Sequence, residues 1–181
     1  MIGYKFLHSD GTGVFSGFRW PLPEAGEPGS WVETRVDPCR SGVHACRPAD
    51  LPLWISEILY EVELAGEIVE QPSKVVAARG RLLRRIDVWD ERLRDAYTRM
   101  CADRAHGIAH GASPPLDHWD AVVELSVPEG PALLGFVAAR IGEERWGRPA
   151  FQAERARQAG WLVAHLGLPG VSERPRSRPN G

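Results

Sequence analysis

The 181-residue sequence lacks several features that would assign it to a familiar class. No uninterrupted apolar run approaches the roughly 18–20 residues that a membrane-spanning helix needs. Residues 1–8 have neither the basic start nor the long apolar stretch of a signal peptide. The three cysteines, an odd number at uneven spacing, do not form a disulfide framework. The formal net charge of −2 gives no strong field toward nucleic acid. We therefore expect a cytoplasmic protein without a membrane or nucleic-acid partner.

Motifs that bind nucleotide phosphates in well-known enzymes are also missing. Residues 11–13 (Gly-Thr-Gly) lack the third glycine and the strand-to-helix context of a dinucleotide-binding fingerprint. No glycine loop leads into the lysine of a P-loop, and no serine lies in a nucleophile-elbow motif. We therefore assign no cofactor and no set of metal ligands.

The sequence does contain many tryptophans and prolines. Seven tryptophans and fifteen prolines occur in a chain that is 43% hydrophobic and 25% charged, a composition typical of a globular protein. Trp20 and Trp31 flank a Pro/Gly-rich connection at residues 21–29. Aromatic residues beside loops belong either to the core or to the walls of a ligand pocket. We predict that Trp20, Trp31, Arg47 and Trp54 contact a substrate.

The first half of the chain carries the signals of β-strands. An Asp-Gly turn between residues 2–7 and 13–20 predicts a hairpin. Further strands are predicted at residues 30–36, 43–46, 58–64, 67–70 and 74–86, with a short helical turn at residues 48–55. Gly66 is expected to end the strand at residues 58–64, and Gly80 is expected to mark a bulge.

The second half changes to helical periodicity. Helices are predicted at residues 88–106, 117–126, 131–146 and 149–166, and Asp87 is expected to cap the first of them. Strands followed by helices are typical of α+β proteins. We expect one domain at residues 1–168, in which residues 1–87 form a mostly antiparallel sheet and residues 88–168 form a helical layer packed on it. Residues 169–181 are rich in Pro, Ser and Arg and are expected to form a disordered tail.

Several segments of residues 1–87 resemble a bacterial and phage domain family of unknown function. The matching segments are Tyr4-Lys5, Asp10-Gly11-Thr12, residues 17–20 (Gly-Phe-Arg-Trp), residues 39–46, residues 48–51, residues 61–67 and residues 74–77. The most specific of them is Cys-x-x-Gly-x-His, which begins at Cys39. The resemblance implies the architecture and points to this segment, but it implies no activity.

The same half also resembles, more faintly, the ADP-ribosyltransferase fold. In that fold a short glycine-containing strand is followed by a helix and a further strand, and residues 42–46, 48–55 and 59–64 are similar in kind. The resemblance places His8 where the family often has a histidine on its first strand. It places His44 where the family has a tyrosine or a variant. The late catalytic glutamate of the family has no clear counterpart here.

His44 is the strongest candidate for a functional side chain. A regular strand at residues 43–46 directs His44 and Cys46 to one face. Glu61 and Glu63 likewise share one face of their strand, and paired carboxylates can divide the roles of acid and base. If the two strands are neighbours, His44 and Glu61 or Glu63 form an acid–base pair. In the alternative, both glutamates face solvent and His44 only bonds a neighbouring loop.

Two groups of side chains leave metal binding open. Cys39-x4-His44-x-Cys46 offers three zinc ligands, although paired Cys-x-x-Cys units are absent. His106 and His110 would share one helix face, but Gly107 and Gly111 argue against a continuous helix there. The candidates for a third ligand are Asp103, Asp117 and His118. In both cases the alternative is an ordinary packed or polar role.

Together these features favour a small cytosolic enzyme that acts on a small or nucleotide-like molecule in an aromatic-lined pocket. His44 with Glu61 or Glu63 would supply acid–base chemistry, and the reaction could be ADP-ribosyltransferase-like. The alternative is a non-catalytic binding module of phage or stress biology, in which the tryptophans contact a partner. A concave pocket with His44 and a carboxylate within hydrogen-bond reach favours the enzyme, and a structure in which the two pack apart contradicts it. A flat apolar patch favours the binding module. The sequence does not indicate an oligomeric state.

Overall fold

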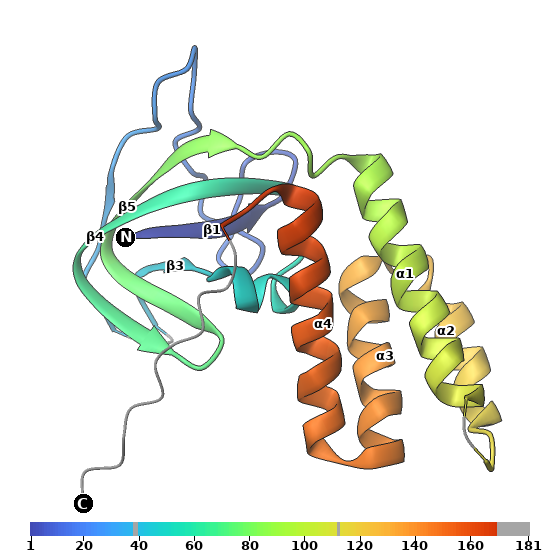
Figure 1. Cartoon of the computed structure of the whole chain (residues 1–181). Helices are drawn as coiled ribbons and strands as arrows, with labels where there is room; N and C mark the ends of the chain where they lie inside the picture. Colours follow the sequence, from blue (N-terminus) through green and yellow to red (C-terminus); the bar gives the residue numbers. More distant parts are fainter. Residues whose placement is uncertain (38–39, 112, 170–181) are drawn as a thin grey trace, which may run out of the picture.

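The computed structural model of the chain describes residues 1–37, 40–111 and 113–169. An antiparallel sheet occupies the N-terminal half, and a layer of helices packs on it (Figure 1). The strands are β1 (Ile2–Leu7), β2 (Val32–Glu33), β3 (Val43–Ala45), β4 (Ile58–Gln71) and β5 (Lys74–Arg85). The helices are η1 (Pro48–Leu53), α1 (Glu91–His110), η2 (Asp117–Trp119), α2 (Asp120–Ser126), α3 (Pro131–Trp146) and α4 (Arg148–Leu166). The predicted α+β class is confirmed.

The long β4–β5 hairpin curls, and β1 and β3 close the curl (Figure 1). β1 pairs with the first half of β4, whereas β3 pairs with the first half of β5. The two shorter strands then meet at Tyr4 and Cys46, whose backbone groups exchange hydrogen bonds of 2.9 and 2.7 Å. A cluster of apolar side chains fills the curl, comprising Leu7, Trp20, Val43, Ala45, Tyr60, Val62, Leu64, Val75, Ala77 and Leu82.

Two glycines shape this hairpin differently from the prediction. Gly66 does not end β4, because the strand continues to Gln71; instead, Gly66 has φ +76° and lies where the β4–β5 register shifts. Gly80 marks no bulge and pairs directly with Leu64. A Cβ atom at Gly80 would lie 2.5 Å from Val43 Cγ1, so the glycine permits close packing inside the curl.

Residues 13–20, predicted as the second strand of a hairpin, form a loop. Isolated bridges join Leu7 to Gly13 and Thr12 to Arg19, and no longer ladder follows. The predicted turn is therefore present. The residues after it fold back on themselves, because Gly13 N donates a hydrogen bond to the Phe18 carbonyl. The strand predicted at residues 30–36 shortens to β2.

The helices begin and end close to the predicted positions, with two differences in α1. Its N-cap is Asp90, which accepts a 2.8 Å hydrogen bond from Leu93 N, rather than Asp87. The helix also continues through Gly107 to His110, since Ala105, Ile108 and Ala109 are buried against the neighbouring helices. Packing therefore overrides the low helix propensity of glycine.

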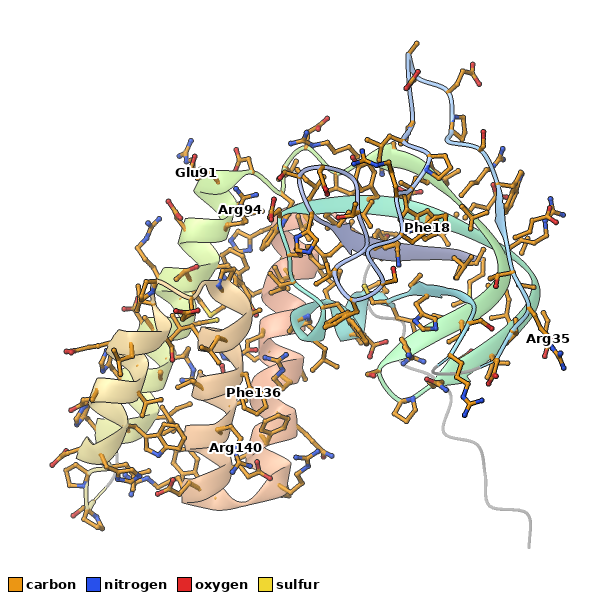
Figure 2. The ribbon with its side chains drawn as sticks, turned by 180° about the vertical axis from the view of Figure 1, so that it is seen from behind. Phe18, Arg35, Glu91, Arg94, Phe136 and Arg140 are labelled. Carbon is orange, nitrogen blue, oxygen red and sulfur yellow. The ribbon has the colours of Figure 1, made fainter. Side chains whose placement is uncertain are left out.

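A second apolar cluster joins the helices to the sheet. It combines Tyr4, Phe6 and Leu59 from the sheet with Leu51 of η1, with Trp89 just before α1, and with buried helical residues such as Tyr97. At the start of α1, Arg94 donates a 2.7 Å hydrogen bond to the Glu57 carbonyl just before β4 (Figure 2).

Polar side chains of α4 complete the attachment of the helices. Arg155 donates a 2.6 Å hydrogen bond to the Pro52 carbonyl in η1. No helix within the described ranges is both long and apolar enough to cross a membrane.

Candidate ligand pocket

A pocket of about 90 Å³ opens beside the Tyr4–Cys46 bridge, where β1 and β3 come together. Its lining comes from β1, from the loop after the first turn, from β3, from the end of η1 and from the start of β5. The lining residues are Tyr4, Lys5, Phe6, Gly13, Val14, Phe15, Ser16, His44, Ala45, Cys46, Trp54 and Lys74. The closed curl therefore brings together five separate parts of the sequence.

His44 contributes an imidazole to this pocket without a partner for one of its nitrogens. The residue pairs with Val76 of β5 across the ladder. Its Nε2 atom is buried and has no hydrogen-bond partner among the described residues. Burial, together with the charges of Lys74 and Lys5, lowers the pKa of His44 to about 4. At neutral pH the ring is therefore uncharged and available for a hydrogen bond to a ligand.

Lys5 directs its ammonium toward the same place. The Nζ atom donates a 2.8 Å hydrogen bond to the His44 carbonyl and lies 4.9 Å from the centroid of the Trp20 ring. Burial lowers the pKa of Lys5 to about 8. This value allows a fraction of the amine to lose its proton near neutral pH.

Lys74 adds a second ammonium, 5.9 Å from the centroid of the Trp54 ring. Lys5 and Lys74 are the only two lysines in a chain that has twenty arginines, and both line the pocket. Lysine differs from arginine because it can be deprotonated under physiological conditions. Both side-chain amines of the chain that can titrate therefore lie at one site.

Aromatic rings form one side of the pocket. Phe15 and Trp54 meet edge to face, with ring centroids 5.6 Å apart. Trp54 is anchored because its Nε1 donates a 2.7 Å hydrogen bond to the Ser73 carbonyl. Phe15, in contrast, is 81% exposed at the mouth. An exposed ring next to an anchored one offers a surface on which a flat group can stack.

The cysteine at the pocket is held as a thiol. Cys46 Sγ donates to the Tyr4 carbonyl at 3.1 Å, and burial raises the pKa of Cys46 to about 12. Zinc requires the thiolate form. Cys39, the other cysteine of the predicted ligand group, lies outside the described residues. The arrangement around Cys46 favours a structural role.

The predicted glutamates lie apart from this pocket. Glu61 accepts a 2.5 Å hydrogen bond from Arg84, and Glu63 accepts a 2.8 Å hydrogen bond from Arg81, both across the β4–β5 ladder. Neither residue lines the cavity. The structure therefore does not bring the proposed His–Glu pair together.

The predicted substrate-binding residues occupy three different environments. Trp54 lines the pocket, and Trp20 is buried below Lys5. Arg47 instead braces the β4–β5 turn, since it pairs with Asp50 at 2.6 Å and donates a 2.8 Å hydrogen bond to the Gln71 carbonyl.

Trp31 lies at a distance from the pocket, where the guanidinium groups of Arg79 and Arg81 are 4.8 and 4.7 Å from its ring centroid. The sequence prediction missed Lys5, Phe15 and Lys74. One signal for Lys5 was present, because it is the only charged residue in the strand Ile2–Leu7.

The fold and the pocket define a small α+β protein whose curled sheet carries a cationic, aromatic-walled site. The chain belongs to the family called "Domain of unknown function (DUF7666)", whose model matches residues 1–94. The match includes all five strands and every residue of the pocket. No curated protein and no solved structure matches the chain. These comparisons thus give no support to the resemblance to ADP-ribosyltransferases.

Proposed function

We propose that this chain binds a small anionic, nucleotide-like molecule in the pocket around Lys5, His44 and Lys74. One observation carries the proposal: both lysines and the unpartnered His44 Nε2 converge on one cavity, and no lining residue is acidic. Like charges gathered in a partly buried place repel one another and lose hydration. An anion would relieve both costs.

The chemistry of the lining suggests how such a ligand would lie. A phosphate or carboxylate group would accept hydrogen bonds from Lys74 and from the His44 imidazole. These bonds would be strengthened by the negative charge of the acceptor. A flat group would stack on Phe15 and Trp54 at the mouth. Complete ligand pockets have volumes of roughly 300–1,000 Å³. A cavity of about 90 Å³ encloses only a group of a few heavy atoms, so a nucleotide would extend past Phe15.

A wider hypothesis is that the chain is an enzyme, with Lys5 and His44 as its proton-transferring groups. The pKa of about 8 for Lys5 favours this hypothesis, because general acid–base groups work best near the operating pH. Transfer chemistry on a dinucleotide, as in ADP-ribosylation, is one reaction to examine. The absence of a carboxylate from the pocket lining favours the alternative, a non-catalytic binding module.

We also propose a cytoplasmic location. Cys46 and Cys101 are unpaired and buried, which fits a reducing compartment.

The test is a thermal-shift screen of mononucleotides, nicotinamide dinucleotide, inorganic phosphate and small carboxylates. A ligand that binds only the folded state raises Tm. Lys74→Met should weaken binding by about tenfold or more, because a hydrogen bond to a charged group is lost. Arg92→Met is the matched control, since it removes the same charge from an exposed position on α1. The proposal fails if no anion shifts Tm or if both variants bind equally well.

Turnover of the bound ligand separates the two forms of the hypothesis. An enzyme should lose its rate in His44→Gln while retaining part of its affinity. A binding module should show no product with any ligand that raises Tm.

A further inference from the structure

The C-terminal end of α1 lies away from the sheet (Figure 1). This end carries a cluster of side chains that could bind a metal ion. It consists of His106 and His110 on α1 and of Asp120, the first residue of α2. One ligand atom from each residue lies within 4.8 Å of the other two. This cluster shares no residue with the lining of the pocket and lies outside residues 1–94.

The geometry arises because α1 continues through Gly107. His106 and His110 are one turn apart and therefore share a helix face. Their rings are stacked at an angle of 12°, with centroids 6.3 Å apart. α2 then places Asp120 opposite both rings: its Oδ1 is 2.8 Å from His110 Nε2 and 3.6 Å from His106 Nδ1.

We propose that His106, His110 and Asp120 form a site for a divalent transition metal, with zinc as the expected ion. Two imidazoles and one carboxylate are ligands that zinc accepts. With bonds of 2.0–2.2 Å, tetrahedral ligand atoms lie about 3.3 Å apart. The two distances from Asp120 bracket this value. All three side chains are at least partly exposed, so small rotamer changes can complete the site.

Asp117 extends the cluster on its other side. Its Oδ1 is 3.6 Å from Nδ1 of His110, the ring nitrogen that would remain free when Nε2 binds the metal. A small rotamer change would bring this carboxylate within hydrogen-bond reach, where it would orient the ligating imidazole and increase its basicity. The three ligands leave one position of a tetrahedral ion open to water.

Metal binding would join the C-terminal end of α1 to the start of α2. Residues 111–119 connect these two helices, and the free energy of binding adds to the stability of the folded state. The expected consequence is a corner of the helical half whose stability depends on the metal.

The experiment uses the full chain without an affinity tag, after treatment with a chelator. Titration with Zn²⁺ should show one equivalent bound and a rise in Tm, whereas Mg²⁺ should not raise Tm. Co²⁺ should give the visible absorption of a low-coordinate ion without a sulfur-to-cobalt charge-transfer band. Such a band would assign the metal to cysteine and overturn the proposal.

Variants test each ligand. His110→Ala, His106→Gln and Asp120→Asn should each weaken Zn²⁺ binding by about 100-fold or more, whereas Asp117→Asn should weaken it by about tenfold. His118→Ala is the matched control, because it removes a histidine from the same segment that pairs instead with Glu144 at 3.1 Å. Its binding should remain unchanged.

Two further outcomes contradict the proposal. One is the same affinity for Zn²⁺ in the His106→Gln and Asp120→Asn variants as in the unmodified chain. The other is absence of stoichiometric binding, which would leave His110 and Asp120 as a simple ion pair. Circular dichroism of the metal-free variants verifies that any loss of binding does not result from unfolding.

Discussion

Two charged sites, one in each half of the molecule, are built in opposite ways. In the helical half, Glu154 is 4% exposed, and its carboxylate binds Arg104 at 3.1 Å and Arg157 at 2.7 Å. In the sheet half, Lys5 and Lys74 share a pocket whose lining contains no carboxylate. The site at Glu154 neutralises its charge within the chain, whereas the pocket holds two ammonium groups and no carboxylate.

This difference distinguishes an ion pair that stabilises the fold from the pocket for which we propose a ligand. Burial raises the pKa of Glu154, but the hydrogen bonds and charges of Arg157 and Arg104 outweigh it and hold that pKa below its ordinary value. A carboxylate whose oxygens already accept hydrogen bonds from Arg104 and Arg157 has little capacity left for a ligand. Lys5 keeps part of its desolvation cost despite its hydrogen bond to His44 and its contact with Trp20, because its pKa remains lowered to about 8.

The largest effect on stability is expected when the buried carboxylate of Glu154 is removed. Glu154→Ala should lower the free energy of unfolding by about 3 kcal/mol, since it removes the buried acceptor of charged hydrogen bonds from Arg104 and Arg157. Urea denaturation measures this loss. Glu33→Ala, which removes an exposed partner of Arg79, should change stability by less than about 0.5 kcal/mol. Equal losses in the two variants would remove the distinction between buried and exposed pairs.

A smaller effect is expected where the backbone leads into β3. Gly42 has φ +132°, and a Cβ atom there would lie 2.2 Å from Val76 Cγ1. Gly42→Ala should therefore cost about 2 kcal/mol and displace His44. Gly17→Ala has a similar backbone requirement, φ +62°, but meets nothing within 4 Å. It should cost only about 1 kcal/mol. If Gly17→Ala costs as much as Gly42→Ala, the contact with Val76 is not what matters.

The smallest effect concerns the pH dependence of the pocket. The pKa of His44 falls from 6.5 in the unfolded chain to about 4 in the folded one. As pH falls through that interval, the unfolded chain binds the proton first, so the free energy of unfolding decreases. Between pH 6.5 and pH 4, the free energy of unfolding of His44→Gln should fall by about 1 kcal/mol less than that of the unmodified chain, after allowance for partial exposure. Parallel stability curves for the two proteins would contradict this prediction. A bound anion should reduce the difference.

Much of the fold could be predicted from the sequence because its signals are local. Pro131 and Pro149 mark the beginnings of α3 and α4, and Gly147 separates them. The alternation of apolar and polar residues before Gly66 predicts the start of β4. The loop at residues 13–20 was mistaken for a strand, because its composition resembles one and only long-range pairing decides the matter.

The pocket was predictable only in part. His44 and Trp54 stood out by residue type. Lys5 and Lys74 did not, because lysine is ordinarily a surface residue and their convergence depends on β1 and β3 closing over the hairpin. The arginine partners of Glu61 and Glu63 depend on the β4–β5 register, which local spacing does not reveal.

The closure of the curl at Tyr4 and Cys46 also bears on aggregation. An open sheet presents unpaired backbone groups to other chains, and such edges promote strand addition between molecules. Here β1 and β3 cover part of each other's edge at the bridge. At the other side of the sheet β2 is only two residues long, and its Glu33 pairs with Arg79. The contact that brings the walls of the pocket together therefore also leaves fewer backbone groups free at the sheet edge for strand addition.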